Sequence, residues 1–273
     1  MGLFSRDFSK AGPGVPKDEP RKKGIARFFE IIVREYRDLM KVNMLFFLCV
    51  LPTIATFFMG LFGIFDLALM LSVIFSYPVG GALAASFFCI TRMLRDDPGF
   101  LWDDFKRKFL ENLRQAGLAG VVTVTFLYTQ VFLFWLPIMA DWAVVGWAWF
   151  IVGLALFILF FMVAPYVFLH YAYIGLGTFK IIKNSVLMAL SNPIRSFLGA
   201  FIGLLPWFLM FAFIPVSLLF VPLIPFFVFV LSWLMTLMWV WPIFDQRFQV
   251  EETLIKKKEE SLTNNGDSGS DPE

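Results

Sequence analysis

Long apolar runs separated by short charged segments are the main pattern of this 273-residue chain. A helix needs about 20 mostly apolar residues to cross the hydrocarbon core of a bilayer. Stretches without Asp, Glu, Lys or Arg reach that length at five places: 44–65, 67–91, 115–140, 142–179 and 196–244. These runs predict an all-α membrane protein.

The two longest runs decide how many spans the chain has. The run 142–179 is too short for two spans and a turn, so it predicts one helix that ends near His170 and an exit along the membrane surface. The run 196–244 is long enough for two helices, divided at a group of prolines. The six predicted transmembrane helices cover about 43–65, 67–92, 115–140, 142–171, 196–217 and 222–244.

All 23 lysines and arginines fall on one side of this six-span arrangement. They number 10, 6, 3 and 4 in the segments 1–42, 92–114, 180–195 and 245–273. The three opposite turns, near Asp66, Asp141 and Pro222, hold none. Cytoplasmic segments close to spans are enriched in Lys and Arg. The pattern therefore predicts three hairpins, with both termini in the cytoplasm.

Three of the cytoplasmic segments carry apolar residues at helical spacing between their charges. The first stripe consists of Ile25, Phe28, Phe29, Ile32, Tyr36, Leu39 and Met40. The second recurs every four residues, at Leu101, Phe105, Phe109 and Leu113. The third and weakest consists of Phe179, Ile182, Val186 and Leu190. Basic amphipathic helices of this kind lie at the membrane interface with the apolar face down. Each would precede one transmembrane hairpin.

The ends of the chain differ in composition from its middle. Residues 1–20 are polar and contain Pro and Gly, which predicts a disordered N-terminal segment and no signal peptide. An amphipathic interfacial helix follows at 21–42, and then the six-span membrane domain at 43–245. Residues 246–273 are predicted to form a polar cytoplasmic tail.

Composition also points to lipid as the solvent for part of the chain. Hydrophobic residues make up 59% of it, charged residues only 16%, and the mean hydropathy is +0.76. Soluble domains are about 45–50% apolar and roughly 25% charged. No soluble fold of this size can bury so much apolar surface. Cys49 and Cys89 both lie in apolar runs and predict buried thiols rather than a disulfide or a metal site.

Motifs for catalysis or nucleotide binding are absent from the sequence. A single histidine cannot supply a two-histidine zinc site, and neither a G-x-x-x-x-G-K-[ST] loop nor a G-x-S-x-G turn occurs. We therefore expect no enzyme activity, no cofactor and no metal. Nucleic-acid binding is not expected either, because the basic residues belong to surface helices that face lipid.

Apart from Arg92 at the end of the second, the predicted spans lack Asp, Glu, Lys and Arg, the residues that usually mark ion-coupled transport. Their absence argues against a proton- or sodium-driven carrier, although a passive path stays open. His170, at the inner end of the fourth span, is either a proton or ligand site or an interfacial histidine in an aromatic belt. The deeper tryptophans, Trp149, Trp207 and Trp233, either line a carbohydrate path or contact lipid and protein.

Three segments of the chain are similar to the best-marked segments of one known family. Residues 42–52, VNMLFFLCVLP, match its first-span signature. Residues 80–115, GGALAASFFCITRMLRDDPGFLWDDFKRKFLENLRQ, match a small-residue span followed by an acidic turn and a surface helix. Residues 184–197, NSVLMALSNPIRSF, match the segment before its penultimate span. Together they resemble the YesL family of bacterial multi-pass membrane proteins, although Thr53–Val79 lengthens the first hairpin relative to the family pattern.

The resemblance implies a bacterial plasma-membrane protein associated with carbohydrate uptake. Members of the family have no established activity, but their genes often lie beside those of ABC-type sugar importers. The leading hypothesis is therefore an accessory or assembly component that contacts lipid and ABC sugar-importer subunits. The alternative is a passive transporter or channel for a small solute. Candidate partner-docking residues are Asp103, Asp104, Lys106, Arg107, Asn112 and Asn192, unless they form only a solvated polar face.

Overall fold

The computed structural model describes Lys22, residues 24–64, 67–139, 144–212 and 227–256, and Glu260. These residues form helices and no strand. The helices are α1 (Gly24–Leu61), α2 (Ala68–Phe75), α3 (Tyr77–Leu94), α4 (Leu101–Met139), α5 (Val144–Tyr173), α6 (Thr178–Ser191), α7 (Pro193–Ala212) and α9 (Phe229–Phe248). The predicted disordered segment 1–20 and most of the predicted tail lie outside the described residues.

Five of the described helical segments are long and apolar enough to cross a membrane, so the chain is a multi-pass membrane protein by length and composition. They are Gly24–Leu61, Ala68–Leu94, Leu101–Trp135, Trp147–Tyr173 and Pro193–Met210. Each overlaps one predicted span. The sixth predicted span, 222–244, overlaps α9, but its first residues lie outside the described part of the chain.

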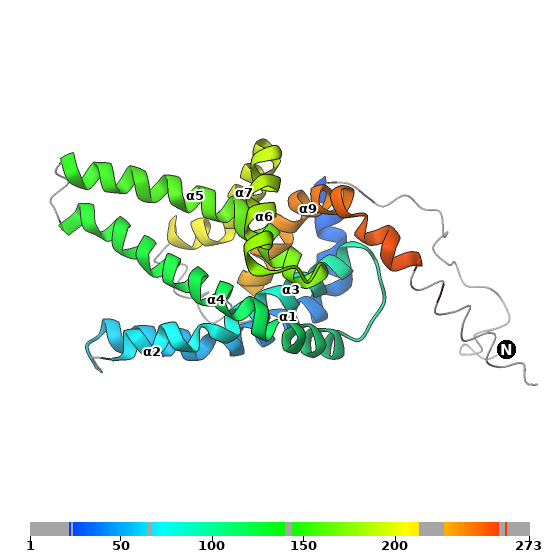
Figure 1. Cartoon of the computed structure of the whole chain (residues 1–273), viewed down its shortest axis with the longest axis horizontal. Helices are drawn as coiled ribbons and strands as arrows, with labels where there is room; N and C mark the ends of the chain where they lie inside the picture. Colours follow the sequence, from blue (N-terminus) through cyan, green and yellow to red (C-terminus); the bar gives the residue numbers. More distant parts are fainter. Residues whose placement is uncertain are drawn as a thin grey trace, which may run out of the picture.

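Two predicted surface helices are not separate elements. The predicted interfacial helix 21–42 and the span after it form the single helix α1, which is kinked at Glu35 (φ −108°, ψ 16°). Figure 1 shows α1 changing direction between its N-terminal part and its long remainder. The second predicted surface helix is the first part of α4, which runs unbroken from Leu101 to Met139. Charged and apolar segments therefore follow one another without a loop in both helices, with a kink in α1 and without a break in α4.

Helix α3 lies at the centre of the fold because its small residues let neighbouring backbones approach. A Cβ atom built on Gly80 would lie 2.6 Å from the carbonyl carbon of Ala116, and one on Gly120 would lie 2.8 Å from the Gly80 Cα. The backbones of α3 and α4 therefore touch at this crossing. Small residues serve this purpose in membranes, where lipid competes equally well for larger apolar side chains.

Helices α7 and α9 also pack closely, through the G-x-x-x-G pair of α7. A Cβ on Gly199 would lie 3.2 Å from the Cβ of Trp239, and one on Gly203 would lie 3.0 Å from the Ser232 carbonyl oxygen. The Ser232 hydroxyl in turn donates a hydrogen bond to the Gly203 carbonyl. This contact joins α7, the last of the five candidate spans, to α9.

The two ends of the molecule differ in which segments they hold. In Figure 1, α4 and α5 run side by side toward the left, where α1 also ends. The start of α1, the loop between α3 and α4, and the helical residues 250–256 lie toward the right. That right-hand end collects most of the described ion pairs.

Candidate functional site

The loop after α3 builds a compact group of charges. Arg92 lies in the last turn of α3 and Arg95 caps it, and the chain then turns at Asp96, whose φ of 60° is in the left-handed region. Aspartate tolerates that conformation better than most residues. Pro98 follows and prevents the helix from continuing. We call the resulting group the arginine cluster: Arg27, Arg34, Arg92 and Arg95 with Asp96, Asp97 and Asp104.

Asp96 ties the start of α1 to the end of α3. Its Oδ2 accepts a hydrogen bond from Arg27 at 2.6 Å, and its Oδ1 lies 2.5 Å from the Arg34 guanidinium. Arg27 is only 6% exposed and also donates to the Leu94 carbonyl at 3.0 Å and to Glu30 at 3.1 Å. An arginine this deeply buried needs such partners, because a desolvated charge without them is very costly.

A second part of the cluster holds the start of α4 against α3. Arg92 donates to Asp104 Oδ2, and Arg107 donates to Asp104 Oδ1 at 2.7 Å. Arg92 is buried, whereas Arg107 is exposed. A Cβ built on Gly99 would lie 3.0 Å from the Asp104 carboxylate, so the loop passes close to this pair. Asp104 thus fixes the geometry of the first turn of α4.

Arg95 connects α3 with α5 and α9 through aromatic rings. Its guanidinium lies 5.4 Å from the ring centroid of Tyr173 and 5.3 Å from that of Trp241. The Tyr173 hydroxyl shares a 2.6 Å hydrogen bond with Thr91, and Asp97 lies 3.8 Å from the guanidinium. Arginine is suited to this position because its flat guanidinium stacks on aromatic faces.

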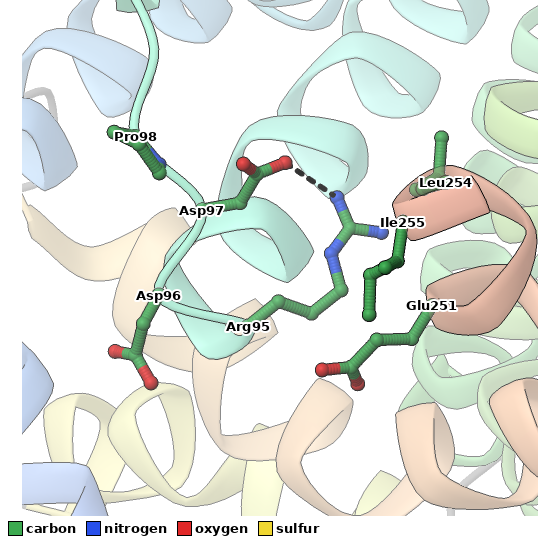
Figure 2. A pocket seen from close by; sticks show the side chains of 7 residues that line it. All are labelled: Arg95, Asp96, Asp97, Pro98, Glu251, Leu254 and Ile255. Atoms are coloured by element: carbon green, nitrogen blue, oxygen red, sulfur yellow. Dashed lines mark ion pairs between the residues drawn. The ribbon is translucent and has the colours of Figure 1, made fainter. Parts of the chain in front are cut away.

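A pocket of about 260 Å³ opens beside Arg95 (Figure 2). It lies between the loop and the helical residues 250–256, and Figure 2 shows Arg95 reaching from one wall toward the other. Its lining consists of Arg95, Asp96, Asp97, Pro98, Glu251, Leu254 and Ile255. Glu252 follows the lining residue Glu251 in the chain, and a hydrogen bond from Lys256 lowers the pKa of Glu252. Within the described ranges, no group of three or more His, Cys, Asp or Glu is arranged to hold a metal ion.

The predicted docking residues on α4 divide into two sets. Asp103, Lys106 and Arg107 are exposed. Asp104 is engaged by Arg92 and Arg107, as described above. Asn112 is buried, and its amide donates to the Lys108 carbonyl at 2.8 Å. Only the first three therefore present side chains on the surface of this helix, while the other two act within the fold.

Asn192, the sixth predicted docking residue, is on a different element. It caps the C-terminus of α6, is half-buried, and donates to the Ser191 hydroxyl at 3.1 Å. It thus contributes to the α6–α7 corner rather than to the exposed face of α4.

The apolar stripe of α4 faces protein instead of lipid. Leu101 and Phe105 are each 5% exposed and belong to the core. Further along, a Cβ on Gly81 of α3 would lie 3.2 Å from both the Phe109 carbonyl and the Leu113 Cα. The expectation that the apolar face of this segment points toward lipid is therefore wrong. Its apolar face packs against α3, and its charged face is the exposed one.

His170 lies inside the protein and not at its surface. It has no exposed area; its Nδ1 lies 2.7 Å from the Tyr166 carbonyl and 3.1 Å from the Ser185 hydroxyl. The rings of Phe244 and Phe248 contact it edge-on, each at 5.1 Å. Its environment is thus an aromatic one formed by α5, α6 and α9.

The three deeper tryptophans lie in different surroundings. Trp233 packs against Phe46 and Phe87, with ring centroids 4.4 and 5.6 Å away. Trp207 contacts Phe229 at 5.0 Å, and Trp149 is exposed. Protein or lipid contact explains each of them without a shared carbohydrate path.

Sequence reasoning missed the members of the arginine cluster outside α4. The available signal was R-x-x-R-D-D-P at 92–98, in which two arginines one turn apart precede two acids and a helix-stopping proline. Their partner Arg27 is 69 residues from Asp96, and no local pattern indicates that pairing.

Searches of family models, curated proteins and solved structures found no match to the chain. The resemblance to the YesL family therefore stays a prediction, and the functional argument depends on the chain itself.

Proposed function

We propose that this chain is an accessory component of a bacterial plasma-membrane transport system, which docks a cytoplasmic partner through the exposed face of α4. In this proposal six spans form three hairpins, both termini are cytoplasmic, and the chain performs no catalysis. The partner class suggested by the YesL resemblance is an ABC-type sugar importer. The one-sided distribution of Lys and Arg supports the orientation.

The observation that carries the proposal is the construction of the α4 face. Asp103 and Lys106 are exposed and have no ion-pair partner among the described residues. Behind them, the buried Arg92–Asp104 pair and the glycine-mediated contact with α3 hold the helix in one position. Charges displayed on a rigid support lose little entropy on binding, which favours a specific interface.

A charge exchange on this face tests the docking role. The variant Asp103→Lys/Lys106→Asp keeps the net charge but inverts the pattern. We expect recovery of ABC subunits in a mild-detergent purification to fall about tenfold, equivalent to about 1.4 kcal/mol of binding. The matched control is Asp38→Lys/Lys41→Asp, which exchanges the members of an exposed ion pair on α1. Equal recovery with both variants, or no ABC subunit with the wild type, would contradict the proposal.

A second candidate function, a passive path for a small solute, is favoured by a few buried polar side chains without hydrogen-bond partners among the described residues. Gln130 of α4 is 2% exposed, and neither its amide nitrogen nor its amide oxygen has a hydrogen-bond partner among the described residues. The buried hydroxyls of Thr53 and Ser86 share that condition. An unmatched buried polar group costs about 1–3 kcal/mol, which a bound water or polar solute would recover.

Flux through reconstituted liposomes tests this second candidate. Wild-type protein should pass small sugars or polyols, and Gln130→Leu should reduce the flux at equal protein density. Absence of flux for the whole panel would exclude the passive path and leave the docking role unaffected.

A further inference from the structure

Helix α6 has three distinct faces. Ile181, Ser185, Met188 and Ala189 are buried and face the protein, where α6 packs on α5. A second face is apolar but exposed, and consists of Phe179, Ile182, Leu187 and Leu190. The third is polar and carries Lys180 and Asn184. A helix with separate protein, lipid and water faces is arranged to lie in a membrane interface.

Exposed apolar side chains also occur at the start of α7, directly after α6 in the chain. Ile194, in the first turn of α7, is 74% exposed, and Phe197 and Phe201 follow on the same side of that helix. Spacings of three, four and seven residues place such side chains on one face. Exposed apolar faces are thus present both on α6 and on the candidate membrane span that follows it in the chain.

The positive charges at this corner have no acidic residue beside them in the same segment of the chain. Residues 178–212 contain Lys180, Lys183 and Arg195 but no Asp or Glu. All three basic residues are exposed, and none has an ion-pair partner in the described part of the chain. Lys183 lies between Phe179 and Leu187 on the exposed apolar face, one turn from each, where its alkyl stem can run along lipid while the ammonium reaches the headgroups.

The other two basic segments differ in this respect. On α1, Arg27, Arg34 and Lys41 pair with acids of the same chain. Residues 92–114, which include the start of α4, hold six basic and five acidic residues. Arg107 and Lys108 pair with acids, whereas Lys106 and Arg114 have no ion-pair partner among the described residues. Net positive charge next to an exposed apolar face is therefore concentrated at α6, although all three segments look basic in the sequence.

We propose that α6 and the first turn of α7 form a binding surface for anionic phospholipid headgroups. The apolar face would lie among the acyl chains, and Lys180, Lys183 and Arg195 would contact lipid phosphates. The occupant is a lipid rather than a soluble anion, because the cations are interleaved with exposed apolar side chains. Each basic residue near an anionic membrane contributes about 1 kcal/mol, or about fivefold in affinity. This surface is independent of the docking role of α4.

Lipid retention by the full-length protein tests the proposal. Purified protein is exchanged into nanodiscs containing equal phosphatidylglycerol and phosphatidylcholine, re-extracted in mild detergent, and its bound lipids are counted by native mass spectrometry. Wild-type protein should retain phosphatidylglycerol preferentially. The variant Lys180→Gln/Lys183→Gln should lose on the order of 25-fold of that preference. Lys180→Arg/Lys183→Arg should keep it.

The matched control is Arg114→Gln/Arg247→Gln, which removes two exposed basic residues elsewhere. Equal losses in the control and in the α6 variant would overturn the assignment, because only bulk charge would then matter. The assignment also fails if the wild type shows no preference, a result that needs no variant to fold. Displacement of the lipid by millimolar inorganic phosphate would identify a soluble-anion site instead.

Discussion

The link between Asp96 and α1 gives the sharpest test of how the fold is held together. Asp96→Asn keeps a residue that tolerates the left-handed φ of 60° but removes the charge. Removing one partner of a fully buried ion pair costs about 3–5 kcal/mol. Here the cost is smaller, because Asp96 is 32% exposed and Arg27 keeps Glu30 and the Leu94 carbonyl. We expect the loss of the Asp96 charge to cost about 2 kcal/mol through Arg27, and at most about 0.5–1 kcal/mol more through the more exposed Arg34.

A loss of about 2–3 kcal/mol of stability corresponds to roughly a 30- to 150-fold increase in the equilibrium constant for local unfolding of the α1 N-terminal segment. Hydrogen exchange followed by mass spectrometry measures it: amides of residues 24–34 should exchange faster by that factor, while amides in the middle of α3 stay unchanged. Asp38→Asn is the control, because its partner Lys41 is well exposed and such pairs contribute about 0–1 kcal/mol.

The reasoning is refuted if Asp96→Asn and Asp38→Asn behave alike. A double-mutant cycle adds a second check. Arg27→Gln combined with Asp96→Asn should be clearly less damaging than the sum of the single changes, because removing both charges leaves neither one buried alone.

Three further outcomes are expected. Gly120→Ala should lower the melting temperature markedly, with a cost of about 1–3 kcal/mol or more, because its Cβ would push apart the backbones of α3 and α4. Gly177→Ala, where no atom lies within 4 Å, should lower it clearly less, because it only replaces the glycine N-cap of α6. Arg95→Lys should lose about 0.5–2 kcal/mol in thermal unfolding, because lysine cannot stack on two rings at once. Cysteines introduced in place of Asp66 and Asp141 should react with impermeant reagents from outside intact cells; labelling only after permeabilisation would reject the proposed orientation.

The positions of the membrane helices could be predicted because lipid demands long apolar runs. The fourth predicted span, 142–171, closely matches the helix Val144–Tyr173, and the second, 67–92, matches α2 with α3 except for a break at Ser76. Their partners could not be predicted. In a soluble protein an apolar face points to the core, but next to lipid an apolar face has two equally suitable environments.

The stripe from Leu101 to Leu113 illustrates that ambiguity, since it packs on α3, while the stripe from Phe179 to Leu190 is largely exposed. The arginine cluster could not be predicted for another reason. Its pairs join residues far apart in the chain, such as Arg27 and Asp96, and depend on a kink at Glu35 that no proline or glycine marks. The exposed positions of Asp103 and Lys106 were accessible from the sequence, because charges opposite an apolar stripe face water wherever the stripe lies.

The central position of α3 has a consequence for how the protein is made. Its neighbours include α1, synthesised before it, and α4, α5 and α9, synthesised after it. Phe87 of α3 meets Trp233, and Arg95 meets Trp241, both from α9. Helix α3 therefore reaches its final surroundings only when nearly the whole chain has left the ribosome. Until then the part of α3 that carries Phe87 and Arg95 must be covered by lipid or by the insertion machinery, although its small-residue surface can already pack on α4.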